Sequence, residues 1–299
     1  MTIIEQDIRS IPTILRQMHV RIDERKDALE PLLDGPIAFL GCGSSYCVAM
    51  ALAALYEQER HVPGQAFIAS DYLPRPTWMH VAISRTGETT ELVTAMQRIH
   101  EAGGRCLLLA GEQGSPAEAY ADAVLTLEFA AEQGVIQTRF IVAATQALRL
   151  LIAASHVSLH DLSERMERAF ASFEATALLK FDHVVYLGRR WCYGLACAAR
   201  LNLQETALMV PEAHQTLDYR HGPIASADER TLVWCFDPPG DETSAAVIND
   251  VRRTGATVQW TDVDPLIAVA QAQLFALRKA EARGIDPMAP RNLSRAIIL

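Results

Sequence analysis

One short segment of this sequence occurs twice, once in each half. The stretch that begins at Leu40-Gly41 returns at Leu187-Gly188, 147 residues later, which is about half of the 299-residue chain. Each copy opens with an apolar run of β-branched or aromatic residues, breaks at glycine and continues into an Ala- and Leu-rich stretch. Strand, tight turn and helix in this order form the first half of a parallel β–α–β unit. Two such units predict a duplicated α/β domain.

The remaining apolar runs predict further strands of two parallel sheets. Short runs without charged residues alternate with helical patterns, as expected of strands that are covered on both faces. In the first half, the predicted strands are 37–40, 66–69, 81–84, 106–109 and 123–127, and the predicted helices are 88–102 and 136–154. In the second half, the predicted strands are 184–187, 232–236 and 257–260, and the predicted helices are 242–253 and 266–283.

The length of the chain suits two domains of about 150 residues each. We expect residues 1–30 to form one or two amphipathic helices that pack outside the first sheet. The first domain is predicted at 31–158, a polar helical connector at 159–174, and the second domain, with a C-terminal active-site tail, at 175–299.

Charge and hydropathy exclude several classes of protein. Half of the residues are hydrophobic and 21% are charged, so the chain can bury sizeable cores. The net charge is −9 and basic residues form no run, which argues against a nucleic-acid partner. No apolar run reaches ~18 residues, so no membrane contact is expected. The acidic N-terminus does not resemble a signal peptide, and the six cysteines lack metal-ligand spacing, so we expect a cytoplasmic protein without a metal site.

Two loops that follow predicted strands have the composition of an anion site. Residues 41–45 and 84–89 each combine glycine with hydroxyl side chains, and each opens a helix. In a parallel sheet such loops lie beyond the carboxyl ends of the strands, where ligands bind. Free N–H groups at a helix N-terminus attract anions. Ser45, Ser84, Thr86 and Thr89 would therefore form a phosphate cradle, to which Arg85 could add a bidentate cation.

The same residues also suit a purely structural function. Ser and Thr before a helix are good N-caps, and capping would explain one such loop alone. Two loops of this kind in one domain favour ligand binding. Tyr46 stands where a dinucleotide fingerprint needs its third glycine, and neither loop contains the Gly-Lys-Ser/Thr of a P-loop. The equivalent turn of the second half, 188–191, lacks hydroxyls, so we expect the pocket there to be lost or reassigned.

Four blocks of sequence resemble motifs of the sugar isomerase (SIS) domain family, most closely the isomerase half of glucosamine-6-phosphate synthases. Residues 42–45 resemble the C-G-T-S turn of the family, and 84–89 resemble its S-Q-S-G-E-T loop. Residues 204–205 followed by 220–223 resemble its K-E and K-H-G-P motifs, and 290–295 resemble its P-R-N-L-A-K. A weaker match places Glu132 and Gly134 on the family's E-x-G-V segment.

The resemblance implies two tandem flavodoxin-like αβα (SIS) domains, each a parallel sheet covered by helices on both faces, and a homodimer with shared active sites. Glu205 would be the base that moves a proton between C1 and C2 of a sugar, and His221 of the neighbouring subunit would assist ring opening. Judged alone, Glu205 fits a solvated helix end and His221 a surface loop. The implied substrate-binding residues are Gly43, Ser44, Ser45, Ser84, Arg85, Thr86, Gly87, Thr89, Glu132 and Arg295.

These residues predict an aldose–ketose isomerase or an amino-sugar-phosphate deaminase that acts on a hexose 6-phosphate through a cis-enediol or enolamine. One carboxylate can serve first as base and then as acid, so no cofactor is required. Ala198 and Asn202 stand where the synthase has glutamate and lysine, and Arg295 replaces a lysine that could form a Schiff base. These departures leave open a non-catalytic sugar-phosphate sensor, and Arg85 leaves open a sulfonate or carboxylate in place of the phosphate.

Overall fold

The computed structural model of the chain describes residues 1–153 and 159–299. Its strands are β1 (Ile37–Gly41), β2 (Gly64–Ile68), β3 (Met79–Ser84), β4 (Arg105–Ala110), β5 (Ala123–Thr126), β6 (His183–Gly188), β7 (Glu212–Gln215), β8 (Thr231–Cys235) and β9 (Thr257–Gln259). Its α-helices are α1 (Ile3–Arg9), α2 (Ile11–Leu29), α3 (Ser44–Arg60), α4 (Thr90–Glu101), α5 (Arg139–Ile152), α6 (Leu159–Ser172), α7 (Trp191–Ala207), α8 (Glu242–Arg253) and α9 (Pro265–Ala282). None of the helices within these described ranges is long and apolar enough to cross a membrane.

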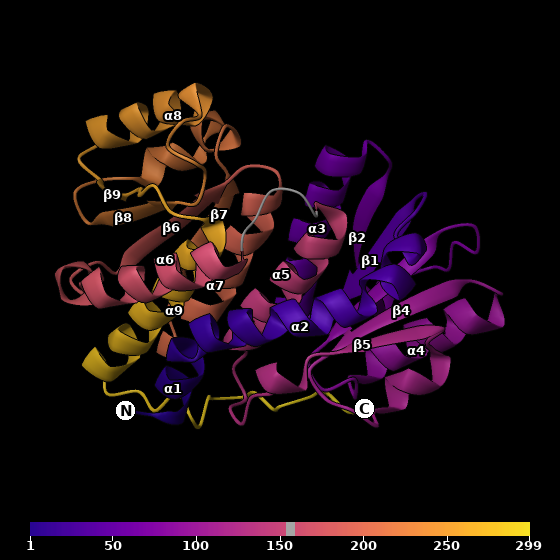
Figure 1. Cartoon of the computed structure of the whole chain (residues 1–299). Helices are drawn as coiled ribbons and strands as arrows, with labels where there is room; N and C mark the ends of the chain where they lie inside the picture. The colour runs from indigo at the N-terminus through magenta and orange to yellow at the C-terminus, as the bar shows by residue number, and fades with distance from the viewer. Residues whose placement is uncertain (154–158) are drawn as a thin grey trace.

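The strands form two parallel sheets with helices packed around them (Figure 1). The first sheet has the order β2-β1-β3-β4-β5, and the second has the order β7-β6-β8-β9. Every strand pair is parallel. The prediction of an α/β fold with two parallel sheets is confirmed.

The predicted elements lie within a few residues of the observed ones, with one exception. Strand β7 was not predicted, because its sequence Glu-Ala-His-Gln contains no apolar run. It forms the edge of the second sheet and its residues are partly exposed, so burial imposes no hydrophobic pattern on it. The end of the helix predicted at 136–154 and the domain boundary predicted at 158 fall on residues 154–158, outside the described ranges.

The 147-residue repeat recurs in the backbone geometry of the two halves. Helices α3 and α7 begin and end at positions that are 147 residues apart. A Cβ on Gly41 would lie 2.5 Å from the backbone carbon of Ser45, and one on Gly188 would lie 2.4 Å from the backbone oxygen of Cys192. Only glycine allows a strand to end this close to the helix that follows it. The glycine that breaks each copy of the repeat therefore serves the same turn twice.

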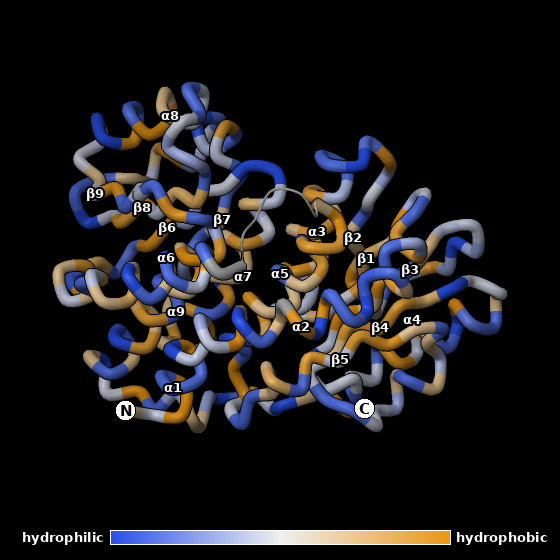
Figure 2. The backbone as a smooth tube through the Cα atoms, viewed as in Figure 1, coloured by the Kyte–Doolittle hydropathy of each residue, from blue (hydrophilic) through white to orange (hydrophobic). Residues whose placement is uncertain are grey.

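Buried side chains alternate between the two faces of each sheet. In β1, Ile37 and Phe39 belong to a large core with α3 and α5, whereas Ala38 and Leu40 belong to a second cluster under α4. Strand β6 alternates in the same way between the large core and a third cluster under α8. Hydrophobic residues accordingly concentrate in the strands and on the inner sides of the helices (Figure 2).

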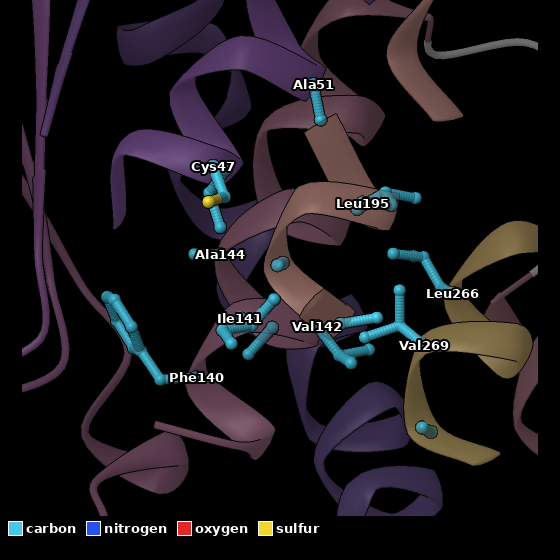
Figure 3. Packing of buried hydrophobic residues seen from close by; sticks show 14 of the residues in the cluster. Cys47, Ala51, Phe140, Ile141, Val142, Ala144, Leu195, Leu266 and Val269 are labelled. Carbon is cyan, nitrogen blue, oxygen red and sulfur yellow. The ribbon is translucent and has the colours of Figure 1, made fainter. Parts of the chain in front are cut away.

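The large core is continuous across the two halves of the chain. Helices α3 and α7 pack against each other so closely that a Cβ on Gly194 would lie 2.3 Å from the backbone nitrogen of Ala51. In the same core Val142 of α5 lies beside Val269 of α9 (Figure 3). The division at 31–158, 159–174 and 175–299 remains a prediction, and the two halves share one interior.

Both ends of the chain connect the halves. Helix α2 packs against α5 and α6, and α1 packs against α9. The N-terminal helices were predicted to pack outside the first sheet, but they also contact helices of the second half. After α9, the tail runs back to the first half and ends near α4 (Figure 1, yellow). There the backbone N–H of Thr90 donates to the carbonyl oxygen of Ile297 at 3.0 Å, and the Leu299 N–H donates to Oγ1 of Thr90 at 3.0 Å.

Candidate active site

The two predicted anion loops lie next to each other at the carboxyl ends of adjacent strands in the first sheet. Strands β1 and β3 are adjacent and parallel, so the loops at 41–45 and 84–89 leave the sheet at the same end. Their side chains surround a small cavity, which we call the anion cradle. Its walls include Cys42, Ser45, Ser84, Arg85, Thr86 and Thr89.

The hydroxyl groups of the cradle also stabilise the second loop. Ser84 Oγ accepts a hydrogen bond from the N–H of Gly87 at 2.9 Å, and Thr86 Oγ1 accepts one from the N–H of Glu88 at 3.2 Å. The structural interpretation of these residues is therefore correct in part. Each hydroxyl still has its own hydrogen to donate, and Thr89 makes no side-chain bond to cap α4. Loop stabilisation and anion binding are compatible in this arrangement.

A larger cavity of about 170 Å³ adjoins the cradle and contains Glu205. Gly43 and Ser44 line it at the start of α3. The two cavities share the residues Cys42, Arg85, Thr89, Gln137 and Arg295. A ligand held by its anionic end in the cradle would therefore extend toward Glu205.

Glu205 lies in the last turn of α7 and is partly buried. Burial raises the pKa of its carboxyl to about 7, and the nearby charges of Arg85 and Arg200 oppose this rise. Glu205 is thus not the solvated helix residue that its sequence position alone suggests. A carboxyl with such a pKa is available as both base and acid near neutral pH.

Arg85 is not an open cation but one half of a buried ion pair. Its Nη1 lies 3.6 Å from Oε2 of Glu132, and the two side chains are 1% and 0% exposed. Nη1 also donates to the carbonyl oxygen of Gly134 at 2.9 Å, and Nη2 donates to that of Arg295 at 3.0 Å. Two of its five N–H groups thus donate to backbone carbonyl oxygens, while Nε has no partner among the described residues. The contact of Arg85 with an anion stays a prediction; the observed bonds of its guanidinium connect its loop to Gly134 and to the C-terminal tail.

Two residues assigned to substrate binding do not line either cavity. Glu132 is fully buried, and its Oε1 accepts from the backbone N–H of Thr138 at 2.7 Å and from Oγ1 of Thr138 at 2.6 Å. Burial raises the pKa of Glu132, and Arg85 and these two bonds oppose the rise. Gly87 has a φ of 68°, and a Cβ there would lie 2.2 Å from Ser115 Oγ. Their assignment to substrate binding stays a prediction; in the structure Glu132 pairs with Arg85, and Gly87 shapes its loop.

The C-terminal tail forms a wall of the larger cavity through residues 293–297. Arg295 Nη2 donates to the carbonyl oxygen of Glu132 at 2.9 Å, and its guanidinium forms an ion pair with Glu112. In return, the carbonyl oxygen of Arg295 accepts from Arg85. Arg85 thus binds the backbone of the tail, and Arg295 binds the backbone of the segment that contains Glu132. Arg295 lines both cavities while its side chain is engaged with protein acceptors.

Within one chain, His221 and Glu205 line different cavities. His221 is exposed on the second half, in a cavity that also contains Arg189, Arg190 and Asp218. The structure therefore does not bring the two predicted catalytic residues together in one chain. This placement is compatible with the implication that a neighbouring subunit supplies the histidine.

The cysteines of the described structure are unpaired, and five of the six are buried. Their burial agrees with the core positions expected from their apolar flanks. In residues 1–153 and 159–299, no three His, Cys, Asp or Glu side chains are grouped as metal ligands.

Gln137 is a site residue that the sequence did not reveal. It lines both cavities from the segment that leads into α5. It follows the weakly matching Gly134 by three residues, and that match was the only signal near it. The tail residues beside Arg295 were likewise recognised only as part of a motif.

Comparison with known protein families and curated proteins gives a consistent result. Residues 35–154 match the SIS domain. A glutamine–fructose-6-phosphate aminotransferase of Methanothermobacter thermautotrophicus is 24% identical over 98% of this chain and 56% of the relative. The same enzyme of Caulobacter vibrioides is 26% identical over 87% of this chain and 52% of the relative. The chain thus spans about half the length of the curated relatives it matches.

Solved structures share the fold over nearly the whole chain. A glucosamine-6-phosphate deaminase from Thermotoga maritima superposes with a TM-score of 0.79 and 24% identity, over 94% of this chain and 99% of that chain. A tagatose-6-phosphate ketose/aldose isomerase from Escherichia coli gives a TM-score of 0.81 at 17% identity, over 100% of this chain and 96% of that chain. The resemblance inferred from the sequence motifs is confirmed.

Proposed function

Because residues 35–154 belong to the SIS domain family, we propose that this chain is a phosphosugar isomerase or deaminase. The proposed substrate is a hexose 6-phosphate, with or without a 2-amino group. The observation that carries the proposal is Glu205, whose pKa burial raises to about 7, in a cavity that adjoins a hydroxyl-lined anion cradle. The names of similar proteins, which include a deaminase and a ketose/aldose isomerase of sugar phosphates, agree with it.

The phosphate of the substrate is proposed to bind in the cradle. Ser45, Ser84, Thr86 and Thr89 would donate their hydroxyl hydrogens to its oxygens, and the first turns of α3 and α4 add favourable partial charge. The buried guanidinium of Arg85 contributes a positive charge at short range while it keeps its hydrogen bonds to the protein backbone. A sulfonate would satisfy the same contacts, so binding of 6-sulfo sugars is a test of anion specificity.

Glu205 is proposed to move one proton between C1 and C2. In the open-chain aldose it removes the proton from C2, the C–H electron pair forms the double bond of a cis-enediol, and the carbonyl oxygen takes up a proton. The carboxyl then returns its proton to C1 while the C2 hydroxyl loses one, which leaves the ketose. With a pKa of about 7 both forms of the carboxyl are populated near neutral pH.

A deaminase would use the same first half-reaction. A 2-amino sugar gives an enolamine, and return of the proton to C1 leaves an imine at C2. Addition of water to this imine and departure of ammonia yields the ketose phosphate. Isomerase and deaminase therefore differ in the group at C2 and in access of water, and both are included in the proposal.

His221 is proposed to act on the ring oxygen of a substrate bound to the neighbouring subunit. It is exposed and lies apart from the Glu205 cavity of its own chain, so this function requires a homodimer with shared sites. Histidine is suited to this step because it gains and loses a proton near neutral pH. A monomer in solution with full activity would contradict this part of the proposal.

Product analysis by NMR tests the proposal directly. A panel of hexose 6-phosphates and 2-amino-hexose 6-phosphates is incubated with the wild type and with Glu205→Gln. We expect conversion of at least one sugar by the wild type and a loss of about 100-fold or more in the variant. Gln204→Ala, an exposed neighbour on the same helix, is the matched control and should retain activity. Undiminished turnover by Glu205→Gln would remove the proposed base.

A sugar-phosphate sensor is the second candidate function. It is favoured by Asn202 and Arg295, which replace lysines of the synthase and whose side chains are bound to protein acceptors. Tight binding of fructose 6-phosphate without conversion of any sugar in the panel would support this function in place of catalysis.

A further inference from the structure

Gln137 connects the two parts of the site and carries a buried polar atom without a partner. This residue lines both the anion cradle and the Glu205 cavity. Its Oε1 is buried and makes no hydrogen bond to any residue in the described ranges. Buried amide oxygens in folded proteins almost always have a partner, so an unsatisfied one on a residue that lines a cavity points to a ligand that supplies the donor.

The backbone of Gln137 is fixed from two sides. Asn202 Nδ2 donates to the carbonyl oxygen of Gln137 at 3.1 Å, and the next residue, Thr138, is held by Glu132 at 2.7 Å. Asn202 is buried in α7, three residues before Glu205, and residues at this spacing share a helix face. The same face of α7 therefore carries the proposed base and the group that positions Gln137.

We propose that the Gln137 amide binds a hydroxyl or amino group of the sugar, between the phosphate and the carbons on which Glu205 acts, and that Asn202 is its positioning residue. This inference rests on the proposed function. The oxygen accepts a hydrogen bond from an O–H or N–H group, which a simple alkyl phosphate lacks. The amide is neutral, so it orients the sugar without placing a further charge beside Glu205.

The chemistry of the contact defines the ligand class that Gln137 selects. Inorganic phosphate occupies only the cradle and makes no use of the amide. A polyhydroxylated phosphate reaches past the cradle and gains the contact. Gln137 is therefore expected to determine how strongly the site prefers hexose phosphates over phosphate itself.

Calorimetric titration with inorganic phosphate, glucose 6-phosphate and fructose 6-phosphate tests the assignment. We expect Gln137→Leu to weaken binding of the preferred hexose phosphate about tenfold while leaving inorganic phosphate within about twofold of the wild type. Gln133→Leu, an exposed glutamine of the same segment, is the matched control and should change neither. Gln137→Met is a second variant with an unbranched side chain, for use if circular dichroism shows that the leucine variant does not fold.

The positioning function of Asn202 is tested by a double-mutant cycle. Asn202→Leu should also weaken hexose phosphate and spare inorganic phosphate, and the double variant should lose less than the product of the two single losses because both act through one contact. Additive losses would remove Asn202 as the positioning residue.

Three outcomes would overturn the inference, and they are distinguishable. Equal weakening of phosphate and sugar phosphate would show a structural function for Gln137. Unchanged binding and KM in a variant of an active wild type would refute the Gln137 contact while the proposed function stands. A wild type that binds inorganic phosphate but no hexose phosphate would refute the proposed function, and the Gln137 contact with it.

Discussion

The carboxyl of Glu205 is expected to make the folded protein less stable at the pH where it works. Burial raises its pKa from the ordinary value of 4.5 to about 7. The folded state therefore keeps this proton while the unfolded state releases it, so stability falls as the pH rises from about 4.5 to about 7 and is constant above that range. Because one pKa unit corresponds to about 1.4 kcal/mol, the ionised carboxyl costs at most about 3 kcal/mol.

Glu205→Gln removes this cost, because the amide has nearly the same shape and no charge. We expect the variant to be more stable than the wild type by up to about 3 kcal/mol at about pH 8.5 and by less than about 1 kcal/mol at about pH 5. Urea denaturation at several pH values between these limits measures the difference. The same substitution should abolish most of the turnover, so stability and activity should change in opposite directions.

The pH dependence separates desolvation of the carboxyl from other effects of the substitution. The control Gln204→Ala should shift stability equally at every pH, since Gln204 is exposed and does not titrate. A stability gain of Glu205→Gln that is the same at about pH 5 and about pH 8.5, or a loss at the higher pH, would refute the argument from burial.

Three further substitutions test the packing and the tail. Gly194→Ala should destabilise the protein by about 1–3 kcal/mol in urea denaturation, because its Cβ would meet the α3 backbone at 2.3 Å, whereas Gly240→Ala, with nothing within 4 Å, should be neutral. Arg85→Met should cost about 3–5 kcal/mol in the same assay, because it leaves the carboxyl of Glu132 buried without its cation. Arg295→Ala should cost less than about 1 kcal/mol of stability, because its ion pair is partly exposed. It should also raise KM for the sugar phosphate by loosening the cavity wall. An unchanged KM would contradict that function of the tail.

Local signals in the sequence were sufficient for the sheets and the anion loops. The glycines at 41 and 188 and the apolar runs before them predict strand, turn and helix, because these are short-range properties of the backbone and of burial. Strand β7 escaped prediction because an edge strand with partly exposed residues does not need an apolar run. The loops at 41–45 and 84–89 were found because each combines glycine and hydroxyl residues directly after a predicted strand.

Two parallel α/β sheets, the hydroxyl-bearing loops and the motif that contains Glu205 could be predicted from local residue patterns. The pairing of Arg85 with Glu132, the cavity wall formed by the tail and the place of Gln137 in the cavity lining became visible in the fold. Partners that are 210 residues apart in the chain, as Arg85 and Arg295 are, leave no local pattern in the sequence. Burial and charge at a site depend on which distant segments meet there. The pKa of Glu205 and the unpaired amide oxygen of Gln137 are therefore properties of the folded chain alone.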